Sequence, residues 1–156
     1  KSYAMTGWRL GYATGPKDVL EGMLKIYQHS TSCVTAFAQH GALDALTNEA
    51  SKKVVEMMQD TYRVRRDLMT DLIKKSEFLK LGCVPEGAFY CFAAYNVNLL
   101  SFELAKRLLR EAHVATVPCV AFGEFGEGHL RLSYAAPEED IREAFRRMEN
   151  HFRKIN

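Results

Sequence analysis

The feature of this sequence that most constrains its fold is one long stretch with helical periodicity, from residue 48 to residue 75. Its apolar side chains recur at the three- and four-residue spacing of one helix face: Val54, Val55, Met58, Tyr62, Leu68 and Leu72. At about 3.6 residues per turn, such a stretch makes a helix of roughly seven turns. A helix of this length usually bridges two structural units, which we therefore expect on its two sides.

Before this stretch the sequence predicts two further helices. Pro16 suits the first turn of a helix because its ring fixes a helical φ angle. The apolar residues that follow it share one helix face: Val19, Leu20, Met23, Leu24 and Tyr27. A second helix is indicated over residues 34–46, where small residues on the apolar face favour close packing. The first third of the chain is expected to be helical.

After the long stretch the pattern changes to mixed strands and helices. Residues 82–96 combine turn residues with an apolar, aromatic-rich run, which is typical of a buried strand. Ser101 is a candidate N-cap, residues 113–117 are a short β-branched run, and residues 130–134 alternate as a strand does. Acidic residues after Pro137 indicate a last helix. Its apolar face would consist of Ile141, Phe145, Met148 and Phe152. We expect an α/β protein in which the long helix leads into a small α+β domain.

Composition and charge exclude several classes of partner. The 156 residues are 47% hydrophobic and 26% charged, which is the composition of an ordinary folded domain. The 21 basic and 19 acidic side chains leave a net charge of only +2, too weak a field to attract nucleic acid or an anionic membrane. No apolar run reaches the length that a bilayer requires. We expect a cytoplasmic protein.

The four cysteines show no metal-binding or disulfide pattern. They stand far apart in the sequence, at Cys33, Cys83, Cys91 and Cys119. They form no C-x-x-C pair and have no histidine at metal-ligand spacing, which argues against a zinc site and against a secreted disulfide framework. We expect no metal and interpret the cysteines as buried free thiols.

The first nine residues place a lysine and an arginine on the two sides of a turn signal. Gly7 permits a backbone reversal and Thr6 is compatible with a turn, so Lys1 and Arg9 could meet at one small anionic ligand. A lysine near another cation loses its proton more easily and becomes a nucleophile, while a planar guanidinium binds phosphate. Pyridoxal phosphate requires this pairing, an amine for its aldehyde and a guanidinium for its phosphate. The same residues also fit an exposed terminus that leads into a strand.

Residues 1–12, KSYAMTGWRLGY, closely resemble the signature of class I aminotransferases of fold type I, the aspartate aminotransferase superfamily. The resemblance implies that Lys1 is the catalytic lysine that bonds to pyridoxal phosphate and that Arg9 binds the cofactor phosphate. Residues 128–135, GHLRLSYA, resemble the family segment whose arginine binds the α-carboxylate of the amino acid. Arg131 is implied to be this substrate-binding residue.

Three shorter segments are also similar to this family. PEGAFY at residues 85–90 resembles the strand whose aromatic pair lines the domain junction. VPCVAFG at residues 117–123 resembles the loop that covers the site, with Cys119 where the family has glycine. If that position required a positive φ, the cysteine side chain would strain the backbone. Residues 29–32 match a stretch that approaches the partner subunit's site in relatives, and they also fit a plain helix cap.

The resemblance implies the C-terminal part of a pyridoxal-phosphate-dependent transferase fold. Residues 1–48 would be the end of the large cofactor domain, and residues 49–156 the small domain with the long helix. We expect an aminotransferase that transfers an amino group from an L-amino acid to a 2-oxo acid. It would be a homodimer when complete, and this fragment alone would be inactive. Two alternatives stay open, namely a pyridoxal phosphate lyase or synthase of the same fold and the ligand domain of a transcription regulator.

Overall fold

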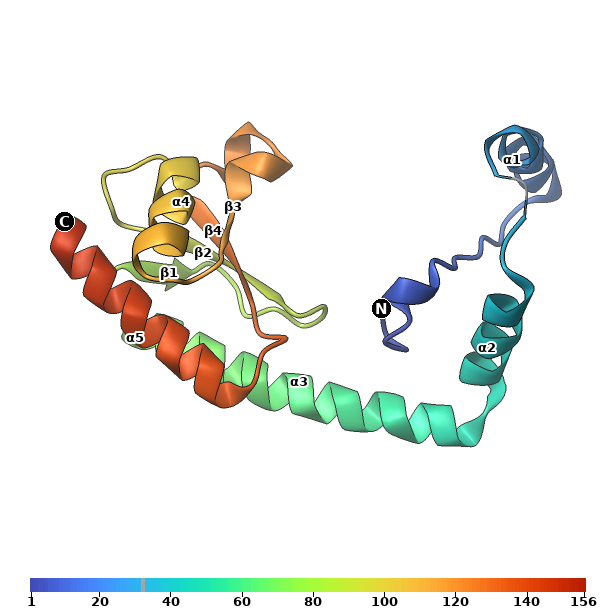
Figure 1. The fold of residues 1–156 in the computed structure, drawn as a ribbon, viewed down its shortest axis with the longest axis horizontal. Coiled ribbons are helices and arrows are strands. Elements are labelled where there is room, and N and C mark those ends of the chain that lie inside the picture. Colours follow the sequence, from blue (N-terminus) through green and yellow to red (C-terminus); the bar gives the residue numbers. More distant parts are fainter. Residues whose placement is uncertain (32) are drawn as a thin grey trace. The chain divides into compact units, whose positions relative to one another are not determined.

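The structure is a computed structural model that describes residues 1–31 and 33–156. The chain divides into two compact units, Lys1–Gln59 and Asp60–Asn156 (Figure 1). The division falls within helix α3, Glu49–Lys75, so α3 contributes residues to both units. The interpretation of residues 29–32 rests partly on Ser32, which lies outside the described residues. No helix in the described ranges is long and apolar enough to cross a membrane.

The long helix predicted from the sequence is confirmed as α3, with 27 residues. Asn48 stands at its start, where Oδ1 accepts a hydrogen bond from the N–H of Ala50 at 2.9 Å. This bond satisfies one of the N–H groups that a helix start leaves without a partner. Glu49 in the first turn and two lysines in the last turn stabilise α3, because their charges are opposite to those of the adjacent helix-dipole ends. The buried side chains of α3 lie near its C-terminal end: Met69, Thr70 and Ile73.

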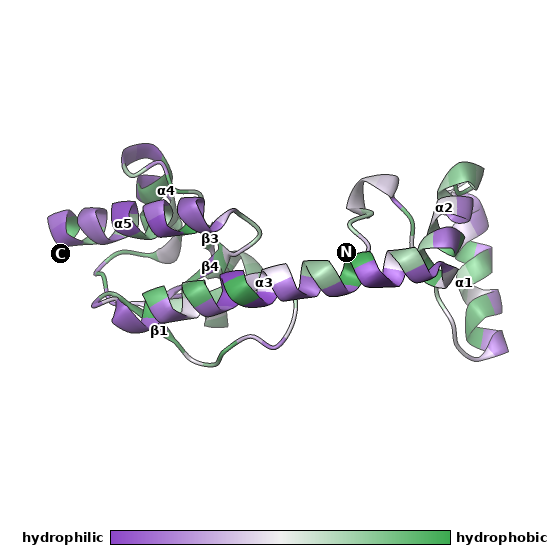
Figure 2. Cartoon of the chain, turned by 90° about the horizontal axis from the view of Figure 1, so that it is seen from below, coloured by the Kyte–Doolittle hydropathy of each residue, from purple (hydrophilic) through white to green (hydrophobic). Residues whose placement is uncertain are grey.

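The first unit contains the two predicted short helices, α1 (Lys17–Ser30) and α2 (Ala36–Thr47), and both are confirmed. Pro16 was predicted in the first turn, but it lies at the N-cap position directly before α1, where its φ is −57° and its ψ of 144° is extended. Figure 2 shows hydrophobic residues along both helices. Within the described residues of α1 and α2, Ala38 alone is buried. The first unit therefore has a large exposed apolar surface.

The second unit is built on a four-stranded sheet with the strand order β1-β2-β4-β3. All neighbouring strands are antiparallel, and the register places Phe92 opposite Arg131 and Tyr90 opposite Ser133. The strands are β1 (Leu79–Leu81), β2 (Tyr90–Tyr95), β3 (Val117–Pro118) and β4 (His129–Ser133). The helices are α4 (Ser101–Glu111) and α5 (Glu138–Ile155). The predicted strands at residues 82–96 and 130–134 and the predicted last helix are confirmed.

The core of the second unit lies on one face of this sheet. Side chains alternate between the two faces along a strand. The residues of β2 and β4 that pack among apolar side chains of α3, α4 and α5 are Cys91, Ala93, Leu130 and Leu132. Tyr90, Phe92 and Arg131 belong to the opposite face, where Phe92 is 47% exposed. The sheet thus has one helix-covered face and one open face, and Arg131 stands on the open face.

The start of α4 differs from the prediction because a distant side chain caps it. Ser101 is the first helical residue, and Leu100 occupies the N-cap position without a side-chain hydrogen bond. The carboxylate of Glu127 accepts the N–H of Ser101 at 2.7 Å and the Ser101 Oγ hydroxyl at 2.9 Å. It also accepts the hydroxyl of Tyr95 at 3.1 Å and the N–H of Gly128 at 3.0 Å. The Glu127 side chain therefore caps α4, a role that we predicted for the side chain of Ser101.

The interpretation of the cysteines as buried thiols is right for two of the four. Cys91 and Cys119 are buried, whereas Cys33 and Cys83 are exposed. Cys33 lies between α1 and α2 and Cys83 follows β1, and neither segment contributes to the core. The expectation for Cys33 and Cys83 was wrong because a hydrophobic preference does not report where a loop lies.

Candidate functional site

The segment that carries Lys1 and Arg9 turns twice within nine residues. The N–H of Ala4 donates to the carbonyl of Lys1 at 2.9 Å, and a 3₁₀ turn follows at Thr6–Trp8. Ala4 and Arg9 adopt left-handed φ angles of 53° and 52°. The predicted reversal is present, but it does not use the freedom of Gly7, which lies inside the 3₁₀ turn. Left-handed backbone at a non-glycine residue costs roughly 1–2 kcal/mol, so the surrounding turn contacts must hold it.

Trp8 holds this turn against α2. Its ring lies over Gly41, where an added Cβ would approach Cζ3 of Trp8 to 2.5 Å. It also meets the ring of Phe37 edge-on, with the ring centroids 6.4 Å apart. Gly41 is required here because only a residue without a side chain leaves room for the indole. These contacts fix the backbone immediately before Arg9.

The side chains of Lys1 and Arg9 are both exposed, and they offer complementary chemistry. Nη1 of Arg9 reaches the Thr6 carbonyl at 3.4 Å, a weak contact that leaves the other guanidinium donors available. A primary amine can add to an electrophilic carbonyl, and a guanidinium can bind a phosphate through two parallel hydrogen bonds. This donor set fits a cofactor that carries both an aldehyde and a phosphate.

Arg131 stands among aromatic rings on the open face of the sheet. Its Cζ lies 4.3 Å from the ring centroid of Tyr90 and 4.8 Å from that of Phe122. The rings of Phe92 and Phe122 are 5.8 Å apart, so Phe92, which pairs with Arg131 across the strands, belongs to the same group. Across residues 1–31 and 33–156, no carboxylate forms an ion pair with Arg131. Within these residues the guanidinium is therefore held by aromatic rings and not by a carboxylate.

A second aromatic group supports the strand that carries Tyr90. Phe89 stacks on Tyr62 with centroids 5.9 Å apart, and Tyr134 meets Tyr62 edge-on at 6.4 Å. The Tyr134 hydroxyl donates to the carbonyl of Ala88 at 3.2 Å, and burial raises the pKa of Tyr134. Ala88 has a φ of 59°, so this bond holds a strained turn directly before β2. That the Phe89 and Tyr90 pair lines a domain junction stays a prediction.

The loop with Cys119 in place of the family glycine is not strained at that residue. Cys119 begins the 3₁₀ turn Cys119–Phe122 and is not among the residues with positive φ. Glycine is needed at two later positions. Gly123 has a φ of 127°, and a Cβ on Gly126 would lie 2.0 Å from the carbonyl oxygen of Cys119. Cys119 is completely buried, which raises the pKa of its thiol, and the loop folds around it.

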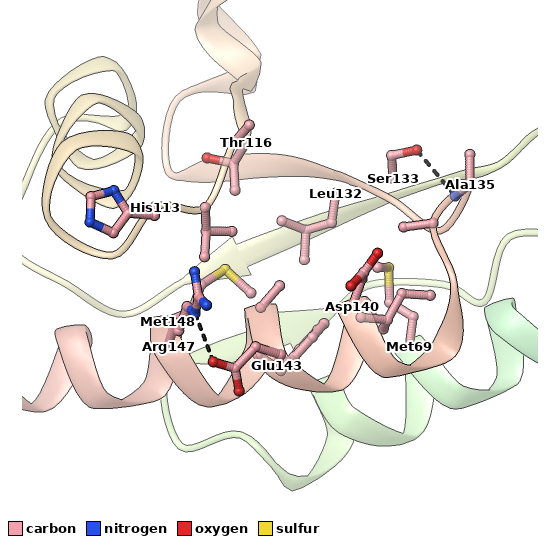
Figure 3. A pocket seen from close by; sticks show the side chains of 16 residues that line it. Met69, His113, Thr116, Leu132, Ser133, Ala135, Asp140, Glu143, Arg147 and Met148 are labelled. Atoms are coloured by element: carbon pink, nitrogen blue, oxygen red, sulfur yellow. Dashed lines mark hydrogen bonds and ion pairs between the residues drawn. The ribbon is translucent and has the colours of Figure 1, made fainter.

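A cavity of about 530 Å³ opens on the helix-covered side of the second unit (Figure 3). Its wall includes Leu132, which alternates with Arg131 along β4, so the cavity and Arg131 belong to opposite sides of the sheet. Arg147 and Glu143 form an ion pair of 2.8 Å at its edge, and the arginines of α5 hold the pKa of Glu143 at about 2. None of the three predicted site residues lines this cavity.

The predicted site residues are divided between the two units. Lys1 and Arg9 belong to the first unit and Arg131 to the second, so their meeting in one site stays a prediction. The sequence did not lead us to predict that Tyr90 and Phe122 contact Arg131. Alternation along β2 and β4 could have placed Tyr90 and Arg131 on one face. No local signal places Phe122 there, because it comes from a turn that follows another strand.

Comparison with known proteins identifies the family. The family described as aminotransferase class I and II matches residues 1–148. Aspartate aminotransferase of Pyrococcus abyssi is 42% identical over 156 residues, which cover 99% of this chain and 39% of that protein. Aspartate/prephenate aminotransferase of Thermus thermophilus is 45% identical over 149 residues, covering 94% of this chain and 37% of that one. The chain thus spans about 39% of the length of such relatives.

Solved structures agree with the sequence comparison. The aromatic aminotransferase from Pyrococcus horikoshii matches with a TM-score of 0.91 and 39% identity, covering 99% of this chain and 41% of that one. The Thermus thermophilus aspartate aminotransferase with maleate matches with a TM-score of 0.89 and 43% identity, covering 96% and 38%. The predicted fold class is confirmed, as is the resemblance drawn from residues 1–12 and 128–135. This chain belongs to the class I and II aminotransferase family.

Proposed function

We propose that the complete protein transfers an amino group from an L-amino acid to a 2-oxo acid with the help of pyridoxal phosphate. The observation that carries this proposal is the family match over residues 1–148. Three relatives that match this chain are named as aspartate, aromatic or aspartate/prephenate aminotransferases, which supports amino acids as substrates. The guanidinium of Arg131 on the open sheet face, which pairs with no carboxylate of the described residues, supports binding of a substrate carboxylate.

Lys1 and Arg9 would hold the cofactor. The amine of Lys1 suits its aldehyde, and the guanidinium of Arg9 suits its phosphate because two of its donors match two phosphate oxygens. When bound, pyridoxal phosphate supplies an electron sink for the negative charge that develops on the substrate α-carbon. The contact of Trp8 with Gly41 fixes the backbone before Arg9, and this would limit the positions that its guanidinium can take when it binds the phosphate.

Lys1 would also move the proton of the reaction. Its Nζ takes the proton from the substrate α-carbon as a general base, which requires a neutral amine near the working pH. Lys1→Ala should therefore abolish turnover and the long-wavelength absorbance of the bound cofactor. Lys25→Ala, at an exposed position of α1, is the matched control.

Arg131 would bind the α-carboxylate of the substrate. A carboxylate that enters a poorly hydrated site needs a charged partner with two donors in one plane, which arginine supplies and lysine does not. Fixing the carboxylate orients the α-proton toward Lys1, and such orientation accounts for a large share of the rate. Arg131→Gln should raise KM for every amino acid substrate. Arg142→Gln, on the exposed side of α5, should leave KM unchanged.

The remaining expectations from the sequence are part of the same proposal. Residues 1–48 would belong to the cofactor domain and residues 49–156 to the small domain. The complete protein would be a cytoplasmic homodimer, without nucleic acid or membrane partners. The exposed apolar residues of α1 and α2 support packing of the first unit against further protein surface.

A nitrogen-transfer experiment tests the function. The complete protein is supplied with pyridoxal phosphate, a ¹⁵N-labelled amino acid and 2-oxoglutarate, and the label is followed by mass spectrometry. Aminotransfer places the label in glutamate, with aspartate and phenylalanine as the first donors to try. A lyase would release labelled ammonia even when no 2-oxo acid is added as an acceptor. A regulator would bind the amino acid without turnover. Either of these results would refute the proposal.

A further inference from the structure

The guanidinium of Arg131 is contacted by two rings from separate segments of the chain. Tyr90 reaches it from β2, and Phe122 reaches it from the 3₁₀ turn that follows β3. We propose that Tyr90 and Phe122 are positioning residues, which hold this guanidinium ready for a carboxylate. The inference rests on the proposed role of Arg131 in binding the substrate carboxylate.

Both rings are themselves fixed by the fold. Tyr90 pairs with Ser133 in the sheet, and its ring lies 4.4 Å from that of Phe89. Phe122 lies between the fully buried Cys119 and Gly123, which has a positive φ of 127°. The ring of Phe122 also packs on Phe92, which is paired with Arg131 across the strands. The two contacts with Arg131 thus come from a strand of the sheet and from a 3₁₀ turn whose Phe122 ring packs on that strand.

The chemistry of these contacts leaves the binding function of Arg131 intact. A ring face attracts a cation within about 6 Å of its centroid, and both distances here are shorter than 5 Å. A ring offers no strong hydrogen-bond acceptor, so it does not consume the N–H donors at the edge of the guanidinium. A carboxylate partner would consume them, and the described part of the chain places none there.

Positioning by rings should strengthen carboxylate binding because the Arg131 side chain is already ordered before the carboxylate binds. A free arginine side chain has many rotamers, and holding it in one before the ligand arrives lowers the entropy lost on binding. Loss of one ring should therefore weaken binding by a factor of roughly three to ten. This loss of affinity should occur only in a protein that has Arg131.

The test measures inhibition of the complete enzyme by maleate, a dicarboxylate without an amino group. Phe122→Leu and Tyr90→Leu should each weaken maleate binding three- to tenfold and raise KM more than they lower kcat. Phe122→Tyr and Tyr90→Phe keep the ring and should stay within twofold of the wild type. Phe125→Leu is the matched control, since Phe125 lies in the same loop and is 94% exposed.

A second readout reports the contact without any ligand. The Nε–H proton of Arg131 should give an upfield-shifted NMR signal because of the ring currents, and Phe122→Leu should move it toward the normal position. In an Arg131→Gln background, Phe122→Leu should have no further effect on maleate binding.

The outcomes separate this inference from the proposed function. If Arg131→Gln weakens maleate binding and Phe122→Leu does not, positioning by the ring is refuted while the carboxylate role stands. If Arg131→Gln has no effect on maleate, the carboxylate role of Arg131 is wrong, and the inference is overturned with it. If both variants weaken binding but no amino group is transferred, the inference stands and the proposed reaction is wrong.

Discussion

Removal of the Ser101 hydroxyl should destabilise the second unit, because this hydroxyl lies at the capped start of α4. Ser101 is completely buried, and its Oγ donates to the carboxylate of Glu127 at 2.9 Å. A hydrogen bond to a charged acceptor contributes about 1.5–3 kcal/mol. Alanine offsets part of this lost free energy, because its helix propensity is about 0.5 kcal/mol more favourable than that of serine. Ser101→Ala should therefore lower the free energy of unfolding by about 1–2.5 kcal/mol.

The assay is urea and thermal unfolding of the chain, followed by circular dichroism. At pH 7 this loss of unfolding free energy corresponds to a decrease in Tm of roughly 3–8 °C. Ser133→Ala is the control, because Ser133 is exposed and accepts only a long hydrogen bond from Ala135. An exposed substitution of this kind should change stability by less than about 0.5 kcal/mol.

The pH dependence gives an independent check on Glu127. The N–H of Gly128, together with the N–H and hydroxyl of Ser101, holds the pKa of the Glu127 carboxyl below its ordinary value. A depressed carboxyl pKa stabilises the folded state above the unfolded pKa, and this stability is lost as the pH falls through the folded pKa. The difference in the free energy of unfolding between wild type and Ser101→Ala should therefore decrease as the pH falls into the acid range. Equal stabilities at pH 7, or a gap that does not change with pH, would refute the capping role of Glu127.

Three further outcomes are expected. Phe152→Ala should cost about 3–5 kcal/mol in urea unfolding, because Phe152 is fully buried against Phe78 and leaves a cavity; a loss below 1 kcal/mol would contradict the packing. Gly41→Ala should displace the ring of Trp8, the single tryptophan, and change its fluorescence maximum, whereas an unchanged spectrum would contradict the contact. Cys83 should react with a thiol reagent in the native chain, while burial, which raises the pKa of Cys91 to about 11, should protect Cys91 until unfolding; equal rates would be inconsistent with this.

The candidate site residues could be named from the sequence because two short segments resemble those of a known family. Lys1 and Arg9 were assigned from the resemblance of residues 1–12, and Arg131 from that of residues 128–135. Their surroundings could not be derived in this way. The rings over Arg131 come from Tyr90 and Phe122, which are distant from it along the chain and approach it only in the folded sheet.

Local sequence patterns by themselves determined the helices and the two central strands: periodicity indicated the long helix and β4, and an apolar, aromatic-rich run after turn residues indicated β2. The 27 residues of α3 repeat one apolar spacing often enough to exclude other structures, and the alternation in β4 does the same on a smaller scale. The strand β1 was missed because three residues are too few to show alternation. The turn at residues 1–9 was predicted, but its left-handed positions at Ala4 and Arg9 were not.

The tertiary structure alone decided where α4 begins, which cysteines are buried and what surrounds Arg131. Glu127 caps α4 from 26 residues away, and no short window of sequence contains both partners. The physical reason is the same in each case. The backbone preference of a segment is set by its own residues, whereas hydrogen bonds, burial and ring contacts depend on which distant segments the fold brings beside it.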